Sequence, residues 1–198
     1  MPLRGVIFDL DGTLVDSRLD FDAIRRDLDL PAGQPILEAL ALIPSGTEKD
    51  RCLAVLRDHE LKGADRATLM PGVADFLTEL AQRGLKTGIL TRNSRESTVL
   101  TLRRLRLEFS VVMTRDEVPP KPDPTGLLEI CRMWNVGTSE VVYVGDYLFD
   151  LLAGKNADIR TVLFAPDGLP DYAAEADYVL RHFSDAARLL VRLCADEI

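Results

Sequence analysis

One short segment, residues 5–17, constrains most strongly how this chain can fold. Its residues 6–8 are an apolar run bounded by turn residues, which is typical of a strand covered on both faces. Two carboxylates, Asp9 and Asp11, follow this run, and Gly12 with the next residue then predicts a turn. We therefore expect a buried strand that carries two acidic side chains at its carboxyl end.

This position has a chemical consequence. In an open α/β sheet, the ligand crevice lies outside the carboxyl ends of the strands. Two carboxylates crowded there are costly unless a cation or a shared proton compensates their charge. The simplest solution is a hard divalent ion with oxygen ligands, Mg²⁺ in particular, with a phosphate as its second partner. The segment therefore predicts both the place of a site and its contents.

Composition excludes several classes of partner. The net charge of −8 argues against nucleic acid or an anionic membrane, since both favour basic patches. An anionic small substrate stays possible, because a metal and a few cationic side chains can dominate the field inside a cleft. The three scattered cysteines predict reduced thiols, hence a cytoplasmic protein. We expect it to be a monomer or a weak homodimer.

Strand-like apolar runs recur along the chain, with amphipathic helices between them. Val73, Phe76 and Leu80, for example, share one helix face. This alternation predicts an α/β fold, with a Rossmann-like parallel sheet and helices on both faces. After the first strand, the expected strands are Lys86–Thr91, Ser110–Met113, Val141–Gly145, Thr161–Phe164 and Tyr178–Leu180.

Residues 16–69 break this alternation. They predict helices only, punctuated by prolines, at Asp20–Leu28, Gln34–Ile43 and Thr47–Leu61. A helical insertion at this point suggests a small lid over the crevice; the alternative is an extra packing layer beside the sheet. We therefore expect a core of residues 1–15 and 70–198 and an all-helical cap of residues 16–69.

Polar side chains follow other expected strands as well, and the carboxyl ends of parallel strands meet at one edge of the sheet. Thr91 ends the second core strand, and Arg92 and Asn93 open the next helix. A hydroxyl together with free N–H groups at a helix N-terminus can cradle a phosphate. This second position therefore predicts phosphate contacts.

The third and fourth positions add charge. Lys121 lies among three nearby prolines, which stiffen its loop, so it can act as a fixed point charge for phosphate. Asp146 follows the strand at Val141–Gly145, and Asp150 comes four residues later, on the same side if the turn is helical. These two aspartates can supply metal ligands or orient the lysine.

Taken in order, the four positions resemble the motifs of the haloacid dehalogenase (HAD) superfamily of phosphatases. The chain is similar to phosphoglycolate phosphatase-like members with a helical cap after the first strand, and the resemblance covers essentially the whole chain. Its most specific part is residues 8–17, Phe-Asp-Leu-Asp-Gly-Thr-Leu-Val-Asp-Ser. Residues 150–157 match the family further.

The resemblance implies a Mg²⁺-dependent phosphomonoester hydrolase acting on a small phosphorylated metabolite. Asp9 would be the nucleophile that forms an aspartyl-phosphate, and Asp11 would protonate the leaving group and then activate water. Asp9, the backbone carbonyl of Asp11 and Asp146 would hold the metal. Asp150 would bind through a metal-bound water or hold Lys121.

The same resemblance assigns the phosphate contacts. Thr91 would hydrogen-bond the phosphoryl oxygens, and Lys121 would neutralise them. Many relatives have asparagine directly after the Thr or Ser, whereas here Arg92 intervenes before Asn93. Both are candidate phosphate contacts, and the alternative for Arg92 is projection to solvent.

Substrate selection is expected in the cap. Arg18, Phe21 and Arg25 lie close to the first hinge and are the candidate substrate contacts. The alternative is that Phe21 packs the cap onto the core while the two arginines stay solvated.

Two rival functions remain. A phosphomutase would use the same intermediate but return the phosphoryl group to a sugar hydroxyl. A catalytically silent binding module would need neither the carboxylates nor the lysine, so the complete set of motifs argues against it. Asp11 favours phosphate chemistry over dehalogenation, because a halide leaving group needs no proton.

Overall fold

The computed structural model describes residues 2–195 and contains a sheet of six parallel strands in the order β5-β4-β1-β6-β7-β8. The α/β class predicted from the sequence is therefore confirmed. The strands are β1 (Gly5–Phe8), β4 (Lys86–Leu90), β5 (Val111–Met113), β6 (Val141–Gly145), β7 (Arg160–Phe164) and β8 (Tyr178–Leu180).

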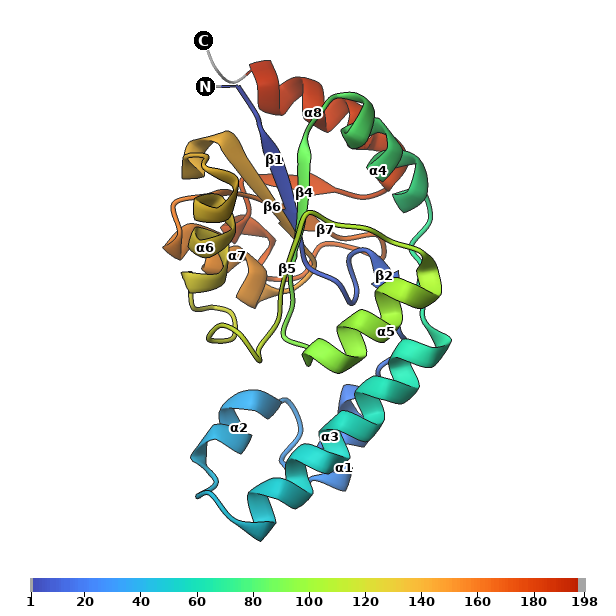
Figure 1. Cartoon of the computed structure of the whole chain (residues 1–198), viewed down its shortest axis with the longest axis vertical. Helices are drawn as coiled ribbons and strands as arrows, with labels where there is room; N and C mark the ends of the chain where they lie inside the picture. Colours follow the sequence, from blue (N-terminus) through green and yellow to red (C-terminus); the bar gives the residue numbers. More distant parts are fainter. Residues whose placement is uncertain (1, 196–198) are drawn as a thin grey trace. The chain divides into compact units, whose positions relative to one another are not determined.

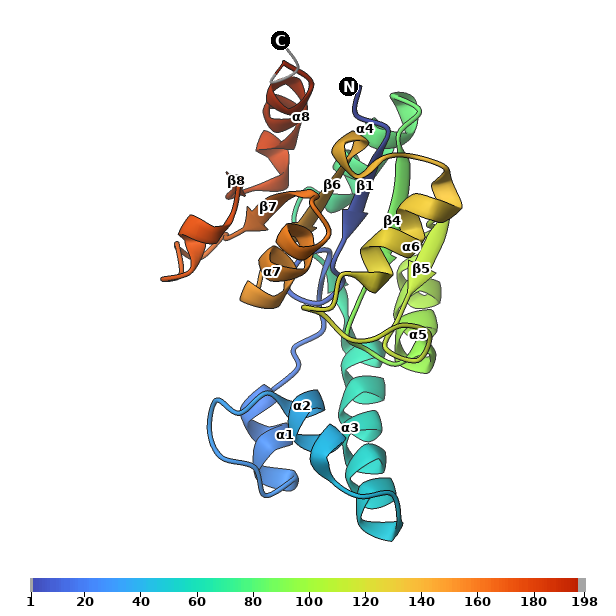
Figure 2. The same ribbon diagram turned by 90° about the vertical axis from the view of Figure 1, so that its left-hand side faces the viewer.

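Helices cover both faces of this sheet. Figures 1 and 2 show α6 (Thr125–Trp134) and α7 (Leu148–Asn156) on one face and α4 (Val73–Gln82) and α8 (Ala186–Ala195) on the other. A strand with helices above and below it has no solvated face, which explains why β1 and β6 are buried along their whole length. Short 3₁₀ helices complete the connections at Thr138–Glu140, Ala173–Glu175 and Phe183–Asp185.

Strand order places the crevice. The chain runs from β1 to β4 and β5 on one side, then returns to β6 on the other side of β1. Ligands bind in open α/β sheets at such a reversal of strand order, beyond the carboxyl ends of the strands. The residues that follow β1, β4 and β6 therefore line the expected place.

Trp134, at the end of α6, packs on the sheet at a glycine of β1 and a glycine of β4. A methyl group at Gly5 or Gly88 would overlap the indole ring. The indole Nε1 donates to the Ser110 hydroxyl over 3.0 Å. The two strand glycines therefore serve close approach of the ring, which makes Trp134 a core residue.

The described chain separates into two compact units. A core unit comprises the residues up to Asp16, Thr68–Arg92 and the residues from Glu108 onward, and a helical unit comprises Ser17–Ala67 and Asn93–Leu107. The helical unit holds α1 (Phe21–Asp27), α2 (Ile36–Leu42), α3 (Thr47–Arg66) and α5 (Arg95–Leu105). Its own apolar cluster is formed by Ile24, Leu28, Ile36, Leu40, Cys52 and Leu56.

The position of α5 differs from the predicted division, which assigned residues 70–198 to the core. In the structure α5 packs along α3 and groups with the helical unit. Glu60 of α3 accepts a 2.8 Å hydrogen bond from the hydroxyl of Ser94, the N-cap of α5. The predicted division between core and cap, at residues 15/16 and 69/70, stays a prediction.

A second, two-stranded sheet was not predicted. Here β2 (Val15–Asp16) pairs antiparallel with β3 (Thr68–Leu69), at the first two of the four places where the chain passes from one unit to the other. Two-residue strands carry too little hydrophobic pattern to be found from the sequence. Within residues 2–195, no helix is long and apolar enough to cross a membrane.

Candidate active site

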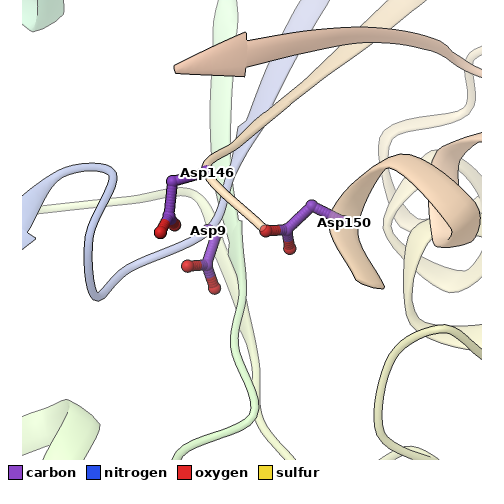
Figure 3. A group of neighbouring side chains, drawn as sticks. All are labelled: Asp9, Asp146 and Asp150. Atoms are coloured by element: carbon purple, nitrogen blue, oxygen red, sulfur yellow. The ribbon is translucent and has the colours of Figure 1, made fainter. Parts of the chain in front are cut away.

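Three aspartates converge beyond the carboxyl ends of the two central strands. Asp9 follows β1, Asp146 follows β6, and Asp150 lies in the first turn of α7. One carboxylate oxygen from each lies within 4.8 Å of the other two, and Figure 3 shows the three carboxylates facing a common space. The structure therefore brings Asp9 together with Asp146 and Asp150, which lie far from it along the chain.

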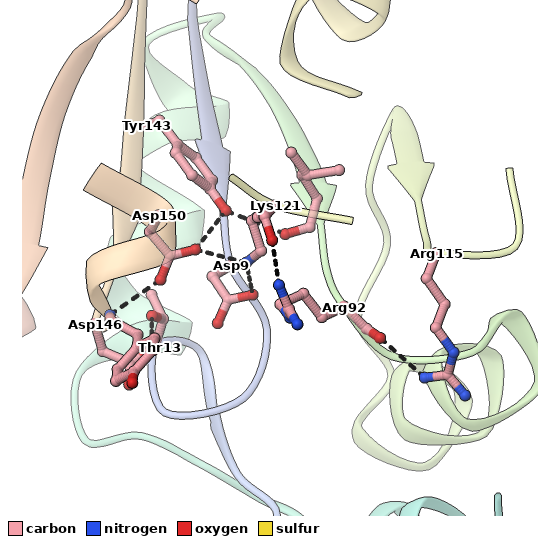
Figure 4. A network of polar contacts seen from close by, with 10 residues as sticks. Asp9, Thr13, Arg92, Arg115, Lys121, Tyr143, Asp146 and Asp150 are labelled. Atoms are coloured by element: carbon pink, nitrogen blue, oxygen red, sulfur yellow. Dashed lines mark hydrogen bonds and ion pairs between the residues drawn. The ribbon is translucent and has the colours of Figure 1, made fainter. Parts of the chain in front are cut away.

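Lys121 connects two of these carboxylates. Its ammonium lies 2.5 Å from Asp9 Oδ1 and 2.5 Å from Asp150 Oδ1, and its side chain is 3% exposed (Figure 4). With this burial and these two partners, Lys121 is part of a closed ionic network. Its charge is placed where a phosphoryl group attached to Asp9 would need it.

Burial dominates the electrostatics of the aspartates. It raises the pKa of Asp9 well above the usual range, although contact with Lys121 opposes that shift. Burial and the neighbouring Asp150 raise the pKa of Asp146 to about 7. The pKa of Lys121 is raised, because its two carboxylate partners outweigh the effect of burial. With all three aspartates ionised, the group would therefore carry more negative charge than one lysine compensates.

Two glycines allow the carboxylates to approach so closely. Gly12 has φ +85°, in the left-handed region, and a side chain there would overlap the carboxylate of Asp146. A side chain at Gly145 would overlap that of Asp150. The Thr13 hydroxyl then donates to Asp146 Oδ1 over 2.9 Å. The close approach at Gly12 and the hydrogen bond from Thr13 thus fix the orientation of Asp146.

Asp150 has partners on both carboxylate oxygens. Oδ1 accepts from Lys121 and lies 2.8 Å from the Tyr143 hydroxyl, and Oδ2 accepts from the Tyr147 backbone N–H over 3.0 Å. Of the two roles considered for Asp150, the structure provides direct contacts for holding Lys121. Binding of a metal by Asp150, through a metal-bound water, stays a prediction.

Sequence reasoning missed Tyr143. This residue is the only polar-tipped side chain of β6, it is 1% exposed, and its ring lies 5.7 Å from the Lys121 ammonium. A buried tyrosine hydroxyl requires a hydrogen-bond partner. That requirement was a usable signal, because the strand ends two residues later at the acidic loop.

Arg92 supports the lysine loop from the opposite side. Its guanidinium donates to the Lys121 backbone carbonyl and lies 4.6 Å from the centre of the Phe149 ring. The Arg92 carbonyl in turn accepts from Arg115 over 2.9 Å. Its contact with the lysine loop was not among the sequence-based alternatives of substrate contact or projection to solvent. Arg115 was also missed, and no local sequence signal distinguishes it.

Three further predicted site residues are the phosphate contacts Thr91 and Asn93 and the acid Asp11. Thr91 directly follows β4, is 3% exposed, and its backbone N–H donates to the Met113 carbonyl over 3.0 Å. Asn93 begins the part of the chain that groups with the helical unit. Asp11 is half-buried in the turn after β1. The roles of these three residues stay predictions.

The predicted cap contacts belong to the helical unit. Arg25 donates to the Gln34 carbonyl over 2.9 Å and to Asp22 over 2.8 Å, and the ring of Phe21 is 53% exposed. The Arg18 carbonyl accepts from Arg66. These contacts are internal to the helical unit, so a substrate role for Arg18, Phe21 and Arg25 stays a prediction.

The acidic group fits a hard divalent cation. Its donors are carboxylate oxygens, which hard cations prefer, and they already lie close to one another. The raised pKa values of Asp9 and Asp146 indicate negative charge that the protein itself does not offset. A divalent ion at this place would offset it.

Comparison with known proteins agrees with this geometry. A family model described as haloacid dehalogenase-like hydrolase matches residues 33–164. The chain belongs to the haloacid dehalogenase-like hydrolase family. A haloacid dehalogenase-like hydrolase domain-containing protein of Arabidopsis thaliana is 32% identical, over 95% of this chain and 84% of the relative.

The chain is also similar to a named pyrophosphatase and to a solved hydrolase structure. The pyrophosphatase PpaX of Bacillus velezensis is 32% identical, over 92% of this chain and 94% of the relative. A hydrolase from Pseudomonas syringae has the same fold, with a TM-score of 0.82 at 24% identity, over 96% of this chain and 99% of that structure. The predicted enzyme class, a phosphatase hydrolase, is thereby confirmed.

Proposed function

We propose that this chain is a Mg²⁺-dependent phosphomonoester hydrolase that acts on a small phosphorylated metabolite through an aspartyl-phosphate at Asp9. The observation that carries the proposal is the buried bridge of Lys121 between Asp9 and Asp150. A lysine held against a carboxylate at a strand end orients that carboxylate and supplies the positive charge that a phosphoryl group requires.

In the first step, a carboxylate oxygen of Asp9 forms a bond to phosphorus while the bond from phosphorus to the leaving oxygen breaks. Asp11 donates a proton to that leaving oxygen, so the alcohol departs neutral. Lys121 holds Asp9 Oδ1, which fixes the rotation of the nucleophile about its side-chain bonds. Phosphoryl transfer depends mainly on such positioning and charge stabilisation.

In the second step, Asp11 takes a proton from a water molecule, whose oxygen forms a bond to phosphorus. The bond between phosphorus and the Asp9 oxygen breaks, which releases inorganic phosphate and regenerates the free carboxylate. Asp150 and Tyr143 keep the Lys121 ammonium in place through both steps, because neither contact involves the reacting atoms.

Mg²⁺ would be held by the carboxylates of Asp9 and Asp146 and by the backbone carbonyl of Asp11. When bound, it neutralises charge on the phosphoryl oxygens and the carboxylates around them. The hydrogen bond from Thr13 orients Asp146 for this contact.

The test is phosphate release from a panel of phosphorylated metabolites, with Mg²⁺ and with chelator, for the native protein and Asp9→Asn. We expect metal-dependent release that disappears in the variant. Trapping of acid-stable phosphate on the native chain but not on Asp9→Asn would identify the intermediate. Retained turnover by Asp9→Asn would overturn the assignment of the nucleophile.

Pyrophosphate is a second candidate substrate, favoured by the PpaX relative. The two candidates differ in the leaving group, which is an alkoxide for a monoester and phosphate for pyrophosphate. Phosphate leaves far more readily, so Asp11→Asn should slow monoester hydrolysis more than pyrophosphate hydrolysis. Release from pyrophosphate alone would select the second candidate, and bisphosphate-dependent isomerisation without net release would select a phosphomutase.

A further inference from the structure

One cation and three aromatic rings form a continuous arc beside the acidic group. The guanidinium of Arg92 lies 4.6 Å from the centre of the Phe149 ring. The Phe149 ring meets Tyr147 edge-on at 5.3 Å between centroids, and Tyr147 meets Tyr172 edge-on at 5.8 Å. All four residues belong to the core unit.

Each end of this aromatic arc is attached to a residue of the site. Arg92 donates to the carbonyl of Lys121, and the Tyr172 hydroxyl donates to the carbonyl of Asp146 over 3.1 Å. In the middle, the Tyr147 backbone N–H donates to Asp150 Oδ2 over 3.0 Å. The arc is therefore fixed to the lysine loop and to both aspartates that follow β6.

Tyr147 is the most exposed of the three aromatic residues of the arc. It is 52% exposed, although it directly follows Asp146 and its ring is held edge-on by two neighbours. An exposed ring with a fixed orientation does not contribute its full apolar area to the core. Its two aromatic neighbours reduce the conformational freedom that binding would otherwise cost, which is the condition for preorganised recognition.

We propose that Tyr147 is a specificity-determining residue that stacks on a ring in the organic part of the substrate. The substrate class is thus a phosphomonoester of a cyclic group with a flat face, a pyranose or an aryl ring. This inference rests on the proposed function, because the phosphate must lie at Asp9 for Tyr147 to meet the group attached to it. Phe149 and Tyr172 are positioning residues that hold the Tyr147 ring.

The experiment measures binding without turnover. Asp9→Asn protein with Mg²⁺ is titrated calorimetrically with glucose 6-phosphate and with sorbitol 6-phosphate, which has the same carbon number but no ring. Phenyl phosphate and propyl phosphate form the aryl arm. We expect the cyclic ester of one pair to bind more tightly than its chain-like partner, and the responding pair identifies pyranose or aryl.

The ring effect is then removed by substitution. In the Asp9→Asn background, Tyr147→Leu should weaken binding of the preferred cyclic ester about tenfold more than binding of its chain-like partner. Tyr147→Phe should keep the preference, because the ring remains. Met133→Ala, at an equally exposed position (52%) at the end of α6, is the matched control and should leave both affinities unchanged.

Failure of this inference is distinguishable from failure of the proposed function. One outcome is that native protein releases phosphate with Mg²⁺ while Tyr147→Leu weakens binding of cyclic and chain-like esters equally, or weakens binding of neither. In that case Tyr147 does not recognise the substrate ring. Equal affinity of Asp9→Asn for cyclic and chain-like esters in both pairs also overturns the inference. Absence of Mg²⁺-dependent phosphate release by the native protein overturns the proposed function itself.

Discussion

The core unit and the helical unit each contain a close ion pair. The two pairs have similar distances but differ in side-chain exposure and in the direction of the carboxyl pKa shift. In the core unit, Lys121 lies 2.5 Å from Asp9 at 3% and 10% side-chain exposure. In the helical unit, Arg57 lies 2.6 Å from Glu96 at 59% and 52% exposure. The pKa of Glu96 is lowered by its hydrogen bond to Arg57, whereas burial raises that of Asp9 despite the lysine.

The difference teaches that surroundings, rather than separation, decide what an ion pair does. A solvated pair is screened by water and holds two mobile side chains, so it contributes little. A buried pair carries a large desolvation cost, and removing one member leaves the other uncompensated. The Lys121–Asp9 pair carries this cost at the carboxyl end of β1, where the proposed function requires a positive charge.

The largest expected effect comes from the nucleophile. Asp9→Asn should lower the rate of phosphate release by about 10⁴-fold or more, because no other group can form the phosphoryl-enzyme bond. Glu96→Gln, which alters the solvated pair, is the control and should keep the native rate. Steady-state phosphate release measures both, and equal losses would remove the distinction between the two pairs.

Breaking the buried pair should be costly for stability as well. Lys121→Met leaves Asp9 and Asp150 without their cation, so we expect a loss of about 3–5 kcal/mol in the free energy of unfolding at neutral pH. The loss should shrink at acidic pH, because burial raises the pKa of Asp9 and its protonated form needs no cation. Urea unfolding at pH 5 and pH 7.5 measures this, with Lys62→Met, from the exposed pair with Asp58, as the matched control.

Metal binding should depend on pH with a definite sign. The pKa of Asp146 is raised from 3.8 to about 7 in the folded chain. Without metal, the stability that the protonated side chain gives the folded state is therefore lost as pH rises through about 7. Mg²⁺ compensates the ionised carboxylate, and at a hundred times its Kd it stabilises by about 2.7 kcal/mol. The Mg²⁺-induced rise in thermal midpoint should therefore grow between pH 5.5 and 8.

Asp146→Asn is the control for this measurement. It removes the titrating carboxylate and one predicted metal ligand while keeping the size of the side chain. We expect the Mg²⁺-induced rise to be small at every pH in this variant. An unchanged, pH-dependent rise would place the metal elsewhere.

A smaller effect is expected from the group that holds the buried pair together. Tyr143→Phe removes a hydroxyl that lies 2.8 Å from Asp150, which should cost about 1 kcal/mol in unfolding free energy. Because Tyr143 positions Lys121 through Asp150, kcat should fall while KM changes little. An unchanged kcat would limit Tyr143 to a structural role.

The smallest effect belongs to the solvated pair. Arg57→Gln should leave the thermal midpoint unchanged within error, although its hydrogen bonds to Glu96 are 2.6 and 2.8 Å long. Differential scanning calorimetry at low and at physiological salt measures it. A clear loss that vanishes at high salt would show that the helical unit depends on this pair more than its exposure indicates.

Much of the fold was predictable because buried parallel strands have a strong local signal. The strand Val141–Gly145 was predicted with the bounds it has, and the strand predicted from Thr161 begins at Arg160. The predicted end of the third helix at Leu61 was wrong, since α3 continues to Arg66. Gly63 lies inside this helix, where its missing side chain leaves room for Leu19, a tertiary contact that the local sequence does not reveal.

Candidate site residues that directly follow strands were predictable from the sequence. Residues that reach the site through contacts between distant segments were not. Asp9, Asp146 and Asp150 were found because strand ends meet at one edge of a parallel sheet. Tyr143 lies inside an apolar strand, and Arg115 contacts the carbonyl of Arg92 from a distant segment of the chain. Such contacts depend on the packing of distant segments, which single-sequence patterns do not encode.

The packing of Trp134 on Gly5 and Gly88 has a practical consequence for spectroscopy. The chain has one tryptophan, and it lies in the core unit. Its intrinsic fluorescence therefore reports the melting of the sheet alone, whereas far-ultraviolet circular dichroism also records the helices of the other unit. Superimposable transitions by the two probes would mean that both units unfold as one cooperative body, and separated transitions would give each unit its own stability.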